Sequence, residues 1–396
     1  MATLAKRIKN VLRSFKWIRN ANSAVKSGID SIKSKIAKVS GFDRFAQTIA
    51  FERFYHNQTT QNYESIDFSK NHFVLFDYPY HHILAASNLG DYIQSIATKN
   101  AVDSIYKDAH YEYFGRDYLA YYNGAFSNKI GGGESQKGES KCTNGKIAIM
   151  QGWFAHSYHF LPPKNILPVF VGTHFASDIQ RYLLYLLACF PHYFDDKTIG
   201  CRDLYTLEFC QKLGLKSYFS RCLTLTLPKA TPNPNQNKIF FVGLEDKFLP
   251  FIPSEIKRHA THINQQCYMS DTLTQTHFFN TANNLLARYK NEAKLIITSA
   301  LHCASPCVAM GIPVIFCRQN DEQITRFSTL SGILPIYTID DFRKKRVDFS
   351  PNAPNIEALK SAMIENLHLS VKQSRGENVD FAKLREIGEF IANFKV

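Results

Sequence analysis

The sequence contains no apolar run of the kind that crosses a membrane or directs secretion. The longest apolar stretch, around Tyr182–Phe190, is shorter than the roughly 20 residues that a membrane-spanning helix needs. The first twenty residues are charged throughout and lack the apolar core and the small-residue cleavage site of a signal peptide. We therefore expect a cytoplasmic protein, either free or peripheral on the inner face of the membrane.

The cysteines lack the spacings that hold a metal ion or a disulfide framework. The chain has nine, an odd number, and no two of them form a CxxC pair. Five lie in apolar or motif-like surroundings, which favours small buried side chains that stay reduced. We predict no metal site and no cofactor.

Positive charge is scarce outside one end of the chain. The formal net charge is +13, but residues 1–40 hold ten Lys and Arg against one acid, Asp30. The other 356 residues carry 37 basic and 33 acidic side chains, which is typical of a balanced globular surface. No stripe of basic and aromatic residues occurs beyond this segment, so we expect no nucleic-acid binding.

The basic segment 1–40 has the pattern of one or two amphipathic helices. Its apolar residues recur at steps of three and four, from Leu4 to Ile18 and again from Val25 to Val39. One interpretation is attachment to an anionic membrane surface, with Trp17 at the interface. The alternative is a helix that packs on the body of the protein or pairs with another chain.

Strand and helix patterns alternate over the rest of the chain, which predicts an α/β fold with parallel sheets and helices on both faces. The expected strands are Asn71–Tyr78, Lys146–Met150, Ile166–Val171, Lys216–Phe219, Lys238–Val242, Leu295–Thr298 and Pro313–Cys317. The expected helices are one that begins near Gly90, then Ile179–Cys189, Leu204–Leu213 and Phe278–Tyr289.

Length and one proline-rich stretch predict two domains. A chain of 396 residues exceeds the usual size of a single core, and PKATPNPNQN at 228–237 interrupts every periodicity. We expect a helical segment at 1–40, a connection at 41–70, domains at 71–227 and 238–396, and a linker at 228–237. The polar Gly131–Gly145 stretch lacks the spacing of a phosphate-binding loop and is better read as a mobile loop.

Three polar turns lie where a strand is expected to meet a helix. In open parallel sheets, ligands bind beyond the carboxyl ends of strands, where helix N-termini offer N–H groups to anions. The turn Ser299-Ala300-Leu301-His302 follows one such strand. A histidine placed there favours function over a purely structural role.

The other two turns combine charged residues with glycine. Arg202 could hold a phosphate or carboxylate in a two-pronged contact, although an Arg202–Asp203 pair that merely caps a helix explains the spacing nearly as well. Gly90 permits close approach of a ligand, and Asp91 could accept a hydroxyl proton. Helix capping by Asn88 or Asp91 is the alternative.

Four segments, in the same order and with similar separations, resemble the polysaccharide pyruvyl transferase family. The resemblance runs from about Phe73 to Arg326, and any one segment alone would be weak. The segments are NLGDYIQSIA, IMQGWFAH, IGCRDLYTLEFCQKLGLKSYFSRCLTLTL and YKNEAKLIITSALHCASPCVAMGIPVIF.

The resemblance implies two Rossmann-like domains facing a cleft, as in two-domain glycosyltransferases of the GT-B type. It implies phosphoenolpyruvate as donor, a glycan or lipid-linked sugar as acceptor, and ketal formation during exopolysaccharide or capsule biosynthesis. It assigns His302 to phosphate contact or proton donation, Arg202 to the donor carboxylate or phosphate, and Asp91 to hydroxyl activation. The remaining substrate-binding candidates are Asn88, Gly90, Asp203, Ser299, Leu301, His156, His174, Arg288 and Arg326.

One position departs from the family pattern. An arginine usually precedes the Leu-His pair, whereas this chain has Ala300. Loss of a charge-assisted contact costs roughly 1.5–3 kcal/mol of donor affinity, so either another cation replaces it or the donor differs. A glycosyltransferase that uses a nucleotide sugar and a non-catalytic family member that binds glycan intermediates or enzyme partners are therefore the alternatives.

Overall fold

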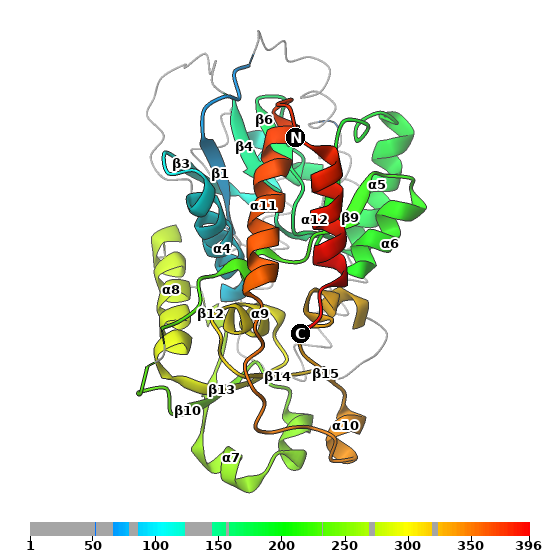
Figure 1. The fold of residues 1–396 in the computed structure, drawn as a ribbon. Helices are drawn as coiled ribbons and strands as arrows, with labels where there is room; N and C mark the ends of the chain where they lie inside the picture. The colour runs from blue at the N-terminus through cyan, green and yellow to red at the C-terminus, as the bar shows by residue number, and fades with distance from the viewer. Residues whose placement is uncertain are drawn as a thin grey trace, which may run out of the picture. The chain divides into compact units, whose positions relative to one another are not determined.

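Strands and helices alternate along the described part of the chain, and every strand pair there but one is parallel (Figure 1). This computed structural model describes residues 52, 66–78, 86–122, 145–155, 158–231, 233–268, 274–318 and 324–396. The predicted α/β class with parallel sheets is confirmed. The segment 1–40, most of 41–70, residues 131–144 and His156 lie outside the described residues.

Two four-stranded parallel sheets are built from residues 72–219. The first has the order β3 (His110–Gly115), β1 (His72–Asp77), β4 (Lys146–Ile149) and β6 (Ile166–Val169). The second has the order β5 (Gly152–Phe154), β7 (Thr173–Phe175), β8 (Ile199–Cys201) and β9 (Ser217–Phe219).

A five-stranded parallel sheet follows in residues 238–337. Its order is β11 (Ala260–Ile263), β10 (Lys238–Val242), β13 (Ala293–Thr298), β14 (Val314–Cys317) and β15 (Ile336–Tyr337). Phe241, Ile297 and Ile315 pack with Phe248 and Phe342 in its core. These last two come from η6 (Asp246–Phe251) and α10 (Ile339–Arg343). A short antiparallel ladder pairs β2 (Ala86–Asn88) with β12 (Gln266–Tyr268).

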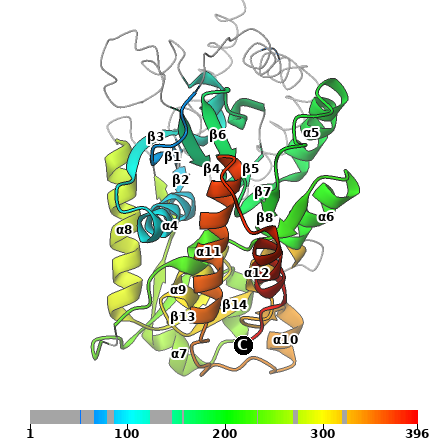
Figure 2. The ribbon, with the colours of Figure 1, turned by 45° about the horizontal axis from the view of Figure 1, so that its top comes forward.

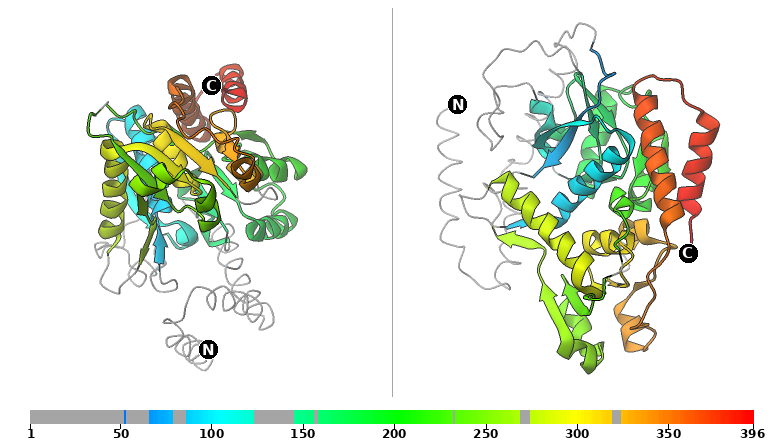
Figure 3. Two further views of the ribbon diagram at one scale, coloured as in Figure 1. Left: turned by 90° about the horizontal axis from the view of Figure 1, so that it is seen from below. Right: turned by 60° about the vertical axis from the view of Figure 1, so that its left-hand side comes forward.

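The helices predicted from apolar periodicity are present. They are α4 (Leu89–Ile105), α5 (Ser177–Cys189), α6 (Leu204–Lys212) and α8 (Gln275–Glu292). A further helix, α9 (Leu301–Ala309), follows β13 and carries His302 in its first turn. The short elements α7 (Ser254–His259), η3 (Arg116–Tyr121), η4 (Tyr158–Phe160), η5 (Leu223–Thr226) and η7 (Ile324–Leu330) connect them. In Figure 3, α4 and α8 run beside each other, and the two helices are in contact.

All seven predicted strands are confirmed. The structure also contains strands that the sequence did not predict. Most of these are only two to four residues long, too short to show alternation. The longer β3 lies at the edge of its sheet and carries exposed polar residues. Local pattern therefore found strands at the edges of sheets, such as β6 and β9, as well as central ones, and missed the short buried central strands β7 and β8.

The last two helices, α11 (Glu357–Ser374) and α12 (Phe381–Asn393), pack on elements that precede residue 220 in the chain (Figure 2). Helix α11 contacts β6 and α4, and α12 contacts β9. The Tyr218 hydroxyl donates to Asn366 at 2.6 Å, and Arg375 donates to Asn71 at 2.8 Å. The described residues from 66 to 396 belong to one compact unit.

Residues 228–231 and 233–237 form no helix or strand, as expected of a connection. The cleft between two Rossmann-like domains stays a prediction. In the described part of the chain, no helix is both long enough and apolar enough to span a bilayer. The eight cysteines described there are free, and most are buried.

Candidate active site

The turns that carry Gly90 and His302 are in direct contact. Gly90 lies in the first turn of α4, where the Asn88 side chain accepts a hydrogen bond from its N–H at 3.0 Å. A Cβ atom placed on Gly90 would lie 3.0 Å from the Cβ atom of His302. His302 is in the first turn of α9, directly beyond β13, with φ −85° and ψ 19°. The missing side chain of Gly90 is therefore what lets the two helix starts meet.

Arg202 is buried at the carboxyl end of β8 with part of its guanidinium unpaired. Only 3% of the residue is exposed, and its backbone N–H donates to Thr173 at 2.8 Å. Its Nε donates to Asp203 Oδ2 at 3.3 Å, while its Nη1 has no hydrogen-bond partner among the described residues. An unpaired buried donor is costly, so this atom indicates a place for an acceptor supplied by a ligand.

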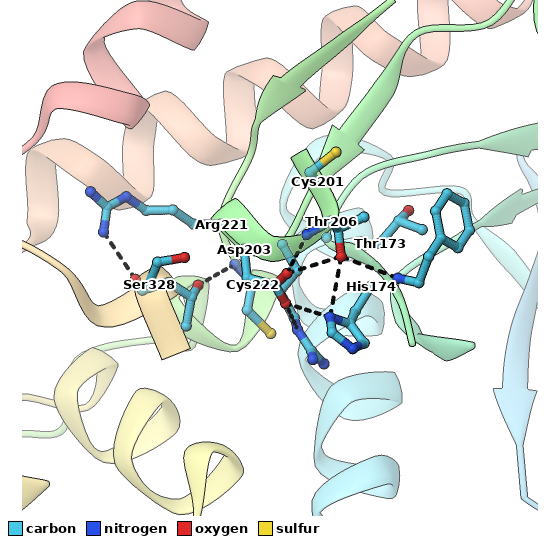
Figure 4. Close-up of polar contacts among 12 residues, drawn as sticks. Thr173, His174, Cys201, Asp203, Thr206, Arg221, Cys222 and Ser328 are labelled. Carbon is cyan, nitrogen blue, oxygen red and sulfur yellow. Dashed lines mark hydrogen bonds and ion pairs between the residues drawn. The ribbon is translucent and has the colours of Figure 1, made fainter. Parts of the chain in front are cut away.

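Asp203 is shared between helix capping and the site (Figure 4). Its Oδ1 accepts from the N–H and the hydroxyl of Thr206, at 3.0 and 2.9 Å, and thus caps α6. Its Oδ2 lies 2.6 Å from His174 Nδ1. Burial alone would raise the pKa of Asp203, but His174 and Arg202 hold it below its ordinary value. The capping interpretation of the Arg202-Asp203 pair is therefore confirmed for Asp203 Oδ1, and anion binding by Arg202 stays a prediction.

His174, at the centre of the three-residue strand β7, is held by Asp203 in one orientation. Its ring is fully buried and stacks on Tyr205, with ring centroids 5.8 Å apart. Burial, with help from Arg202, lowers the pKa of His174 to about 4, so the ring is neutral at pH 7. Because the Asp203 carboxylate accepts a hydrogen bond from the Nδ1–H group of the neutral ring, Nε2 carries a lone pair. This Nε2 atom is buried and has no partner in the described residues.

His302 belongs to the same electrostatic group. Burial, followed by the positive field of Arg202, holds the pKa of His302 well below its ordinary value. Its Nε2 lies 4.0 Å from the Cys222 sulfur, and its carbonyl accepts from Gln265 at 3.3 Å. Two neutral histidines and one cationic guanidinium are therefore gathered from strand β7 and from the turns that follow β8 and β13.

Asp91 faces a buried arginine that the sequence did not single out. Its Oδ1 accepts from Gln94 at 3.0 Å and lies 3.9 Å from Arg116 Nη1. Arg116 is only 1% exposed, and its Nη2 lies 2.8 Å from Asp117 Oδ2. Burial raises the pKa of Asp91, against the opposing charges of Arg116 and Arg202. The sequence signal for Arg116 is weak: an Arg116-Asp117 pair follows β3, a strand that the sequence did not predict.

In a comparison with protein-family models, the chain matches the model described as polysaccharide pyruvyl transferase over residues 88–321. That match covers more than half of the chain and includes the turns at Gly90, Arg202 and His302. The chain belongs to the polysaccharide pyruvyl transferase family. No curated protein and no solved structure gives a significant match.

Other residues predicted for the site of this pyruvyl transferase family member lie near Arg202, His174 and His302, and several of them make structural hydrogen bonds. The Asn88 side chain caps α4. Ser299 is buried with its hydroxyl 3.8 Å from the Cys317 sulfur, and the Leu301 carbonyl accepts from Ser305 at 2.9 Å. Arg326 is partly buried, and its pKa is lowered by burial and then by Arg202, which indicates that the two guanidinium groups are neighbours.

Arg288 does not join the site. Its Nε lies 3.6 Å from Glu292 Oε2, and its guanidinium covers the Phe240 ring at 5.1 Å. Glu292 immediately precedes β13 and also binds Lys238, the first residue of β10. His302 follows the other end of β13, about 20 Å away at 3.3 Å per residue. The substrate-binding role predicted for Arg288 therefore has no support in this geometry.

At the position where the family usually has arginine, Ala300 is the N-cap residue of α9 and supplies no side-chain cap. Two other arginines lie close to this turn. Arg318 Nη1 donates to the Ser299 carbonyl at 2.9 Å, and Arg326 is affected by both Arg202 and Arg318. In the described residues, no group of three or more His, Cys, Asp or Glu side chains could hold a metal ion.

Proposed function

We propose that this protein transfers a pyruvyl group from phosphoenolpyruvate to two hydroxyls of a sugar, as a ketal, in surface polysaccharide biosynthesis. The family supplies the reaction class and the polysaccharide acceptor. One observation carries the proposal further. Arg202 Nη1 and His174 Nε2 are buried without partners, and their residues share the same carboxylate, Asp203.

The donor suits this group because it carries both a carboxylate and a phosphate. Arg202 can bind either anion with its unpaired Nη1, and the uncapped first turn of α9 can offer N–H groups to the other. Arg326 is the cation that we assign to the place of the missing arginine at Ala300.

The reaction needs an acid and a base, and its protons balance. The methylene carbon of phosphoenolpyruvate gains a proton, two sugar oxygens bond to the central carbon, and the bond from that carbon to the phosphate oxygen breaks. Two protons leave the sugar hydroxyls. One equivalent ends on the new methyl group and the other on the released phosphate.

His174 is the best-placed base, because Asp203 fixes its Nδ1 proton and leaves Nε2 free to accept a hydroxyl proton. His302 is neutral in the free protein. An anionic donor beside it would favour protonation, after which it can contact the phosphate or deliver a proton. Asp91 lies at the start of α4, next to the Gly90 contact, where a sugar hydroxyl could reach it.

The direct test is incubation with phosphoenolpyruvate and a panel of nitrophenyl and lipid-linked sugars, followed by mass spectrometry for a ketal-linked pyruvate. The chain with Arg202→Gln should form no product, whereas Arg288→Gln should behave as wild type because Arg288 lies at the far end of β13. Thermal stabilisation by sugar nucleotides but not by phosphoenolpyruvate would instead support the glycosyltransferase alternative. Pyruvylation that persists in Arg202→Gln and His302→Gln would contradict the assigned site.

Attachment to an anionic membrane through residues 1–40 is part of the same proposal. It rests on sequence alone, since that segment lies outside the described residues. Co-sedimentation with anionic vesicles should be lost when residues 1–40 are deleted, and equal binding of the shortened chain would refute it.

A further inference from the structure

Asp77 is a buried carboxylate that the proposed reaction has not used. It ends β1 at the carboxyl edge of the first sheet and is 7% exposed. Its Oδ1 has no hydrogen-bond partner in the described residues. The residue opposite it on β3 is Gly115, so no side chain on that strand lies beside the carboxyl group. Burial raises the pKa of Asp77 to about 6.

Three elements contribute a connected group of aromatic rings on the face of the sheet to which this carboxylate points. Tyr113 on β3 pairs with Leu75, two residues before Asp77, so Tyr113 and Asp77 point to the same face of the sheet. On that face Tyr113 meets Phe279 of α8, with ring centroids 4.9 Å apart. Phe279 in turn meets Tyr92 of α4 at 5.0 Å. Burial and then the charge of Asp77 raise the pKa of Tyr92. Burial, then Asp103 and Asp77, raise the pKa of Tyr113, so Asp77 lies within electrostatic range of both rings.

We propose that Asp77, Tyr113 and Phe279 form the subsite that binds a pyranose ring of the acceptor. An ionised carboxylate accepts hydrogen bonds from sugar hydroxyls, and an aromatic ring covers the C–H face of a pyranose. Tyr113 is 40% exposed and can offer such a face, while the free oxygen of Asp77 supplies the acceptor atom. The inference rests on the proposed function, which requires a sugar in this protein.

Charge separates this subsite from the place assigned to the donor. Asp77 repels a phosphate or carboxylate, whereas Arg202 attracts one. The first turn of α4 connects the two places: Tyr92 lies beside Asp77, and the preceding Asp91 lies in the field of Arg202. A ring held at Asp77 would therefore present its hydroxyls towards Asp91 and the donor.

Asp77 also lies outside the segment that the family model matches, which begins at residue 88. Tyr113 and Phe279 lie inside it. The subsite thus combines two residues inside the segment matched by the family model with one residue outside it. We expect such a combination in a feature that selects one acceptor among several.

Binding of methyl β-D-galactopyranoside to the full chain tests the subsite without catalysis. This probe is suitable because its axial 4-hydroxyl leaves one continuous C–H face. Saturation-transfer NMR titration should show about tenfold weaker binding for Asp77→Asn, the loss of one charge-assisted hydrogen bond. Tyr113→Ala, at a part-exposed ring that the fold can spare, should weaken binding by a similar factor through lost stacking.

Matched controls separate the subsite from general damage. Asp103→Asn changes an acid at the other end of α4, and Phe251→Ala removes a part-exposed ring of η6. Both should bind the pyranoside as wild type does. Stabilisation by phosphoenolpyruvate should be unchanged in all four variants, which shows that the donor site is intact.

The outcomes distinguish this inference from the proposed function. Weaker pyranoside binding in Asp77→Asn and Tyr113→Ala supports the subsite even if no pyruvate ketal ever forms, in which case the proposed function alone fails. A ketal-forming enzyme whose KM for the acceptor is unchanged in both variants overturns the subsite alone. Absence of pyranoside binding to the wild-type chain also overturns it.

Discussion

The backbone of Gly90 lies close to His302, because a Cβ atom added to Gly90 would lie only 3.0 Å from the Cβ atom of His302. This contact joins the first turn of α4, from the first half of the chain, to the first turn of α9, from the second. The two helix starts therefore pack closely enough that a side chain added at Gly90 would press on His302.

Gly90→Ala should therefore lower kcat/KM by roughly 10- to 100-fold, because a displacement of a few tenths of an ångström at His302 spoils its alignment. Stability should change little, since alanine favours helix by about 1 kcal/mol and offsets part of the strain. Gly388→Ala in α12 is the control: its Cβ would meet Tyr218 at an ordinary 3.5 Å. Equal kcat/KM for Gly90→Ala and wild type would show that the contact does not position His302.

Asp203→Asn should separate capping from catalysis. Asparagine caps helices about as well as aspartate, so α6 should persist. An amide cannot hold His174 in the same tautomer, because it can offer an N–H where the carboxylate accepts one. We expect kcat to fall by about 10²–10⁴ while circular dichroism and the melting temperature stay near wild type. A normal kcat in this variant would remove His174 from the role of base.

The carboxyl-end rule for parallel sheets explains which parts of this site could be predicted from sequence. Arg202 and His302 were found because each lies where a strand, β8 or β13, meets the helix that follows it. The same rule excludes Arg288, since α8 runs back to the amino end of β13. His174 was only a secondary candidate because its partner Asp203 lies 29 residues away, and a three-residue strand gives no alternation to orient it.

Other features could not be read from the chain because they depend on long-range packing. The C-terminal helices pack on β6 and β9, which their own apolar periodicity cannot reveal. Arg221 donates to the carbonyls of Ile391 and Thr329, and thereby ties the end of the chain to the turn that carries Cys222 and contacts His302. A composition break such as 228–237 marks a connection but does not tell which helices lie on which side of it.

Arg116→Gln should change the pH dependence of the reaction through Asp91. Burial raises the pKa of Asp91 and the positive charge of Arg116 lowers it, so removing that charge should raise the pKa further. If Asp91 acts ionised, the acidic limb of the kcat/KM profile moves to higher pH. Arg116→Lys keeps the charge and should restore most of the limb, whereas Arg343→Gln, an exposed pair with Asp340, should leave it unmoved. An unshifted limb in Arg116→Gln would mean that Asp91 does not titrate in the reaction.

His174 should make stability depend on pH. Its pKa is lowered from 6.5 to about 4 in the folded state, so the unfolded chain binds more protons between these values. The stability that His174 contributes is present above pH 6.5 and is lost as the pH falls towards 4. Asp77, whose pKa is raised to about 6, acts in the opposite direction. The measurement is therefore the difference in unfolding free energy between wild type and His174→Gln, which should shrink from pH 7 to pH 4.5; a constant difference would contradict it.

The loss of the usual arginine at Ala300 can be tested by restoring it. Ala300 caps α9, and its Cβ lies 3.6 Å from the position of a Cβ on Gly243. Ala300→Arg should tighten phosphoenolpyruvate binding by about tenfold or more if its guanidinium reaches the anion. Arg326→Gln in the wild-type background should weaken binding by a similar factor, because Arg326 neighbours Arg202.

The two changes should not be additive. If Arg326 replaces the missing arginine, Arg326→Gln will cost little once Ala300→Arg is present, and a double-mutant cycle followed by calorimetry will show a coupling of about 1 kcal/mol or more. If Arg326 is unrelated to the donor, its substitution will have the same small effect in both backgrounds. If Ala300→Arg leaves phosphoenolpyruvate binding unchanged but weakens binding of another anion, this chain has departed from the family in its donor. In that case Ala300 marks the residue where the change of donor occurred.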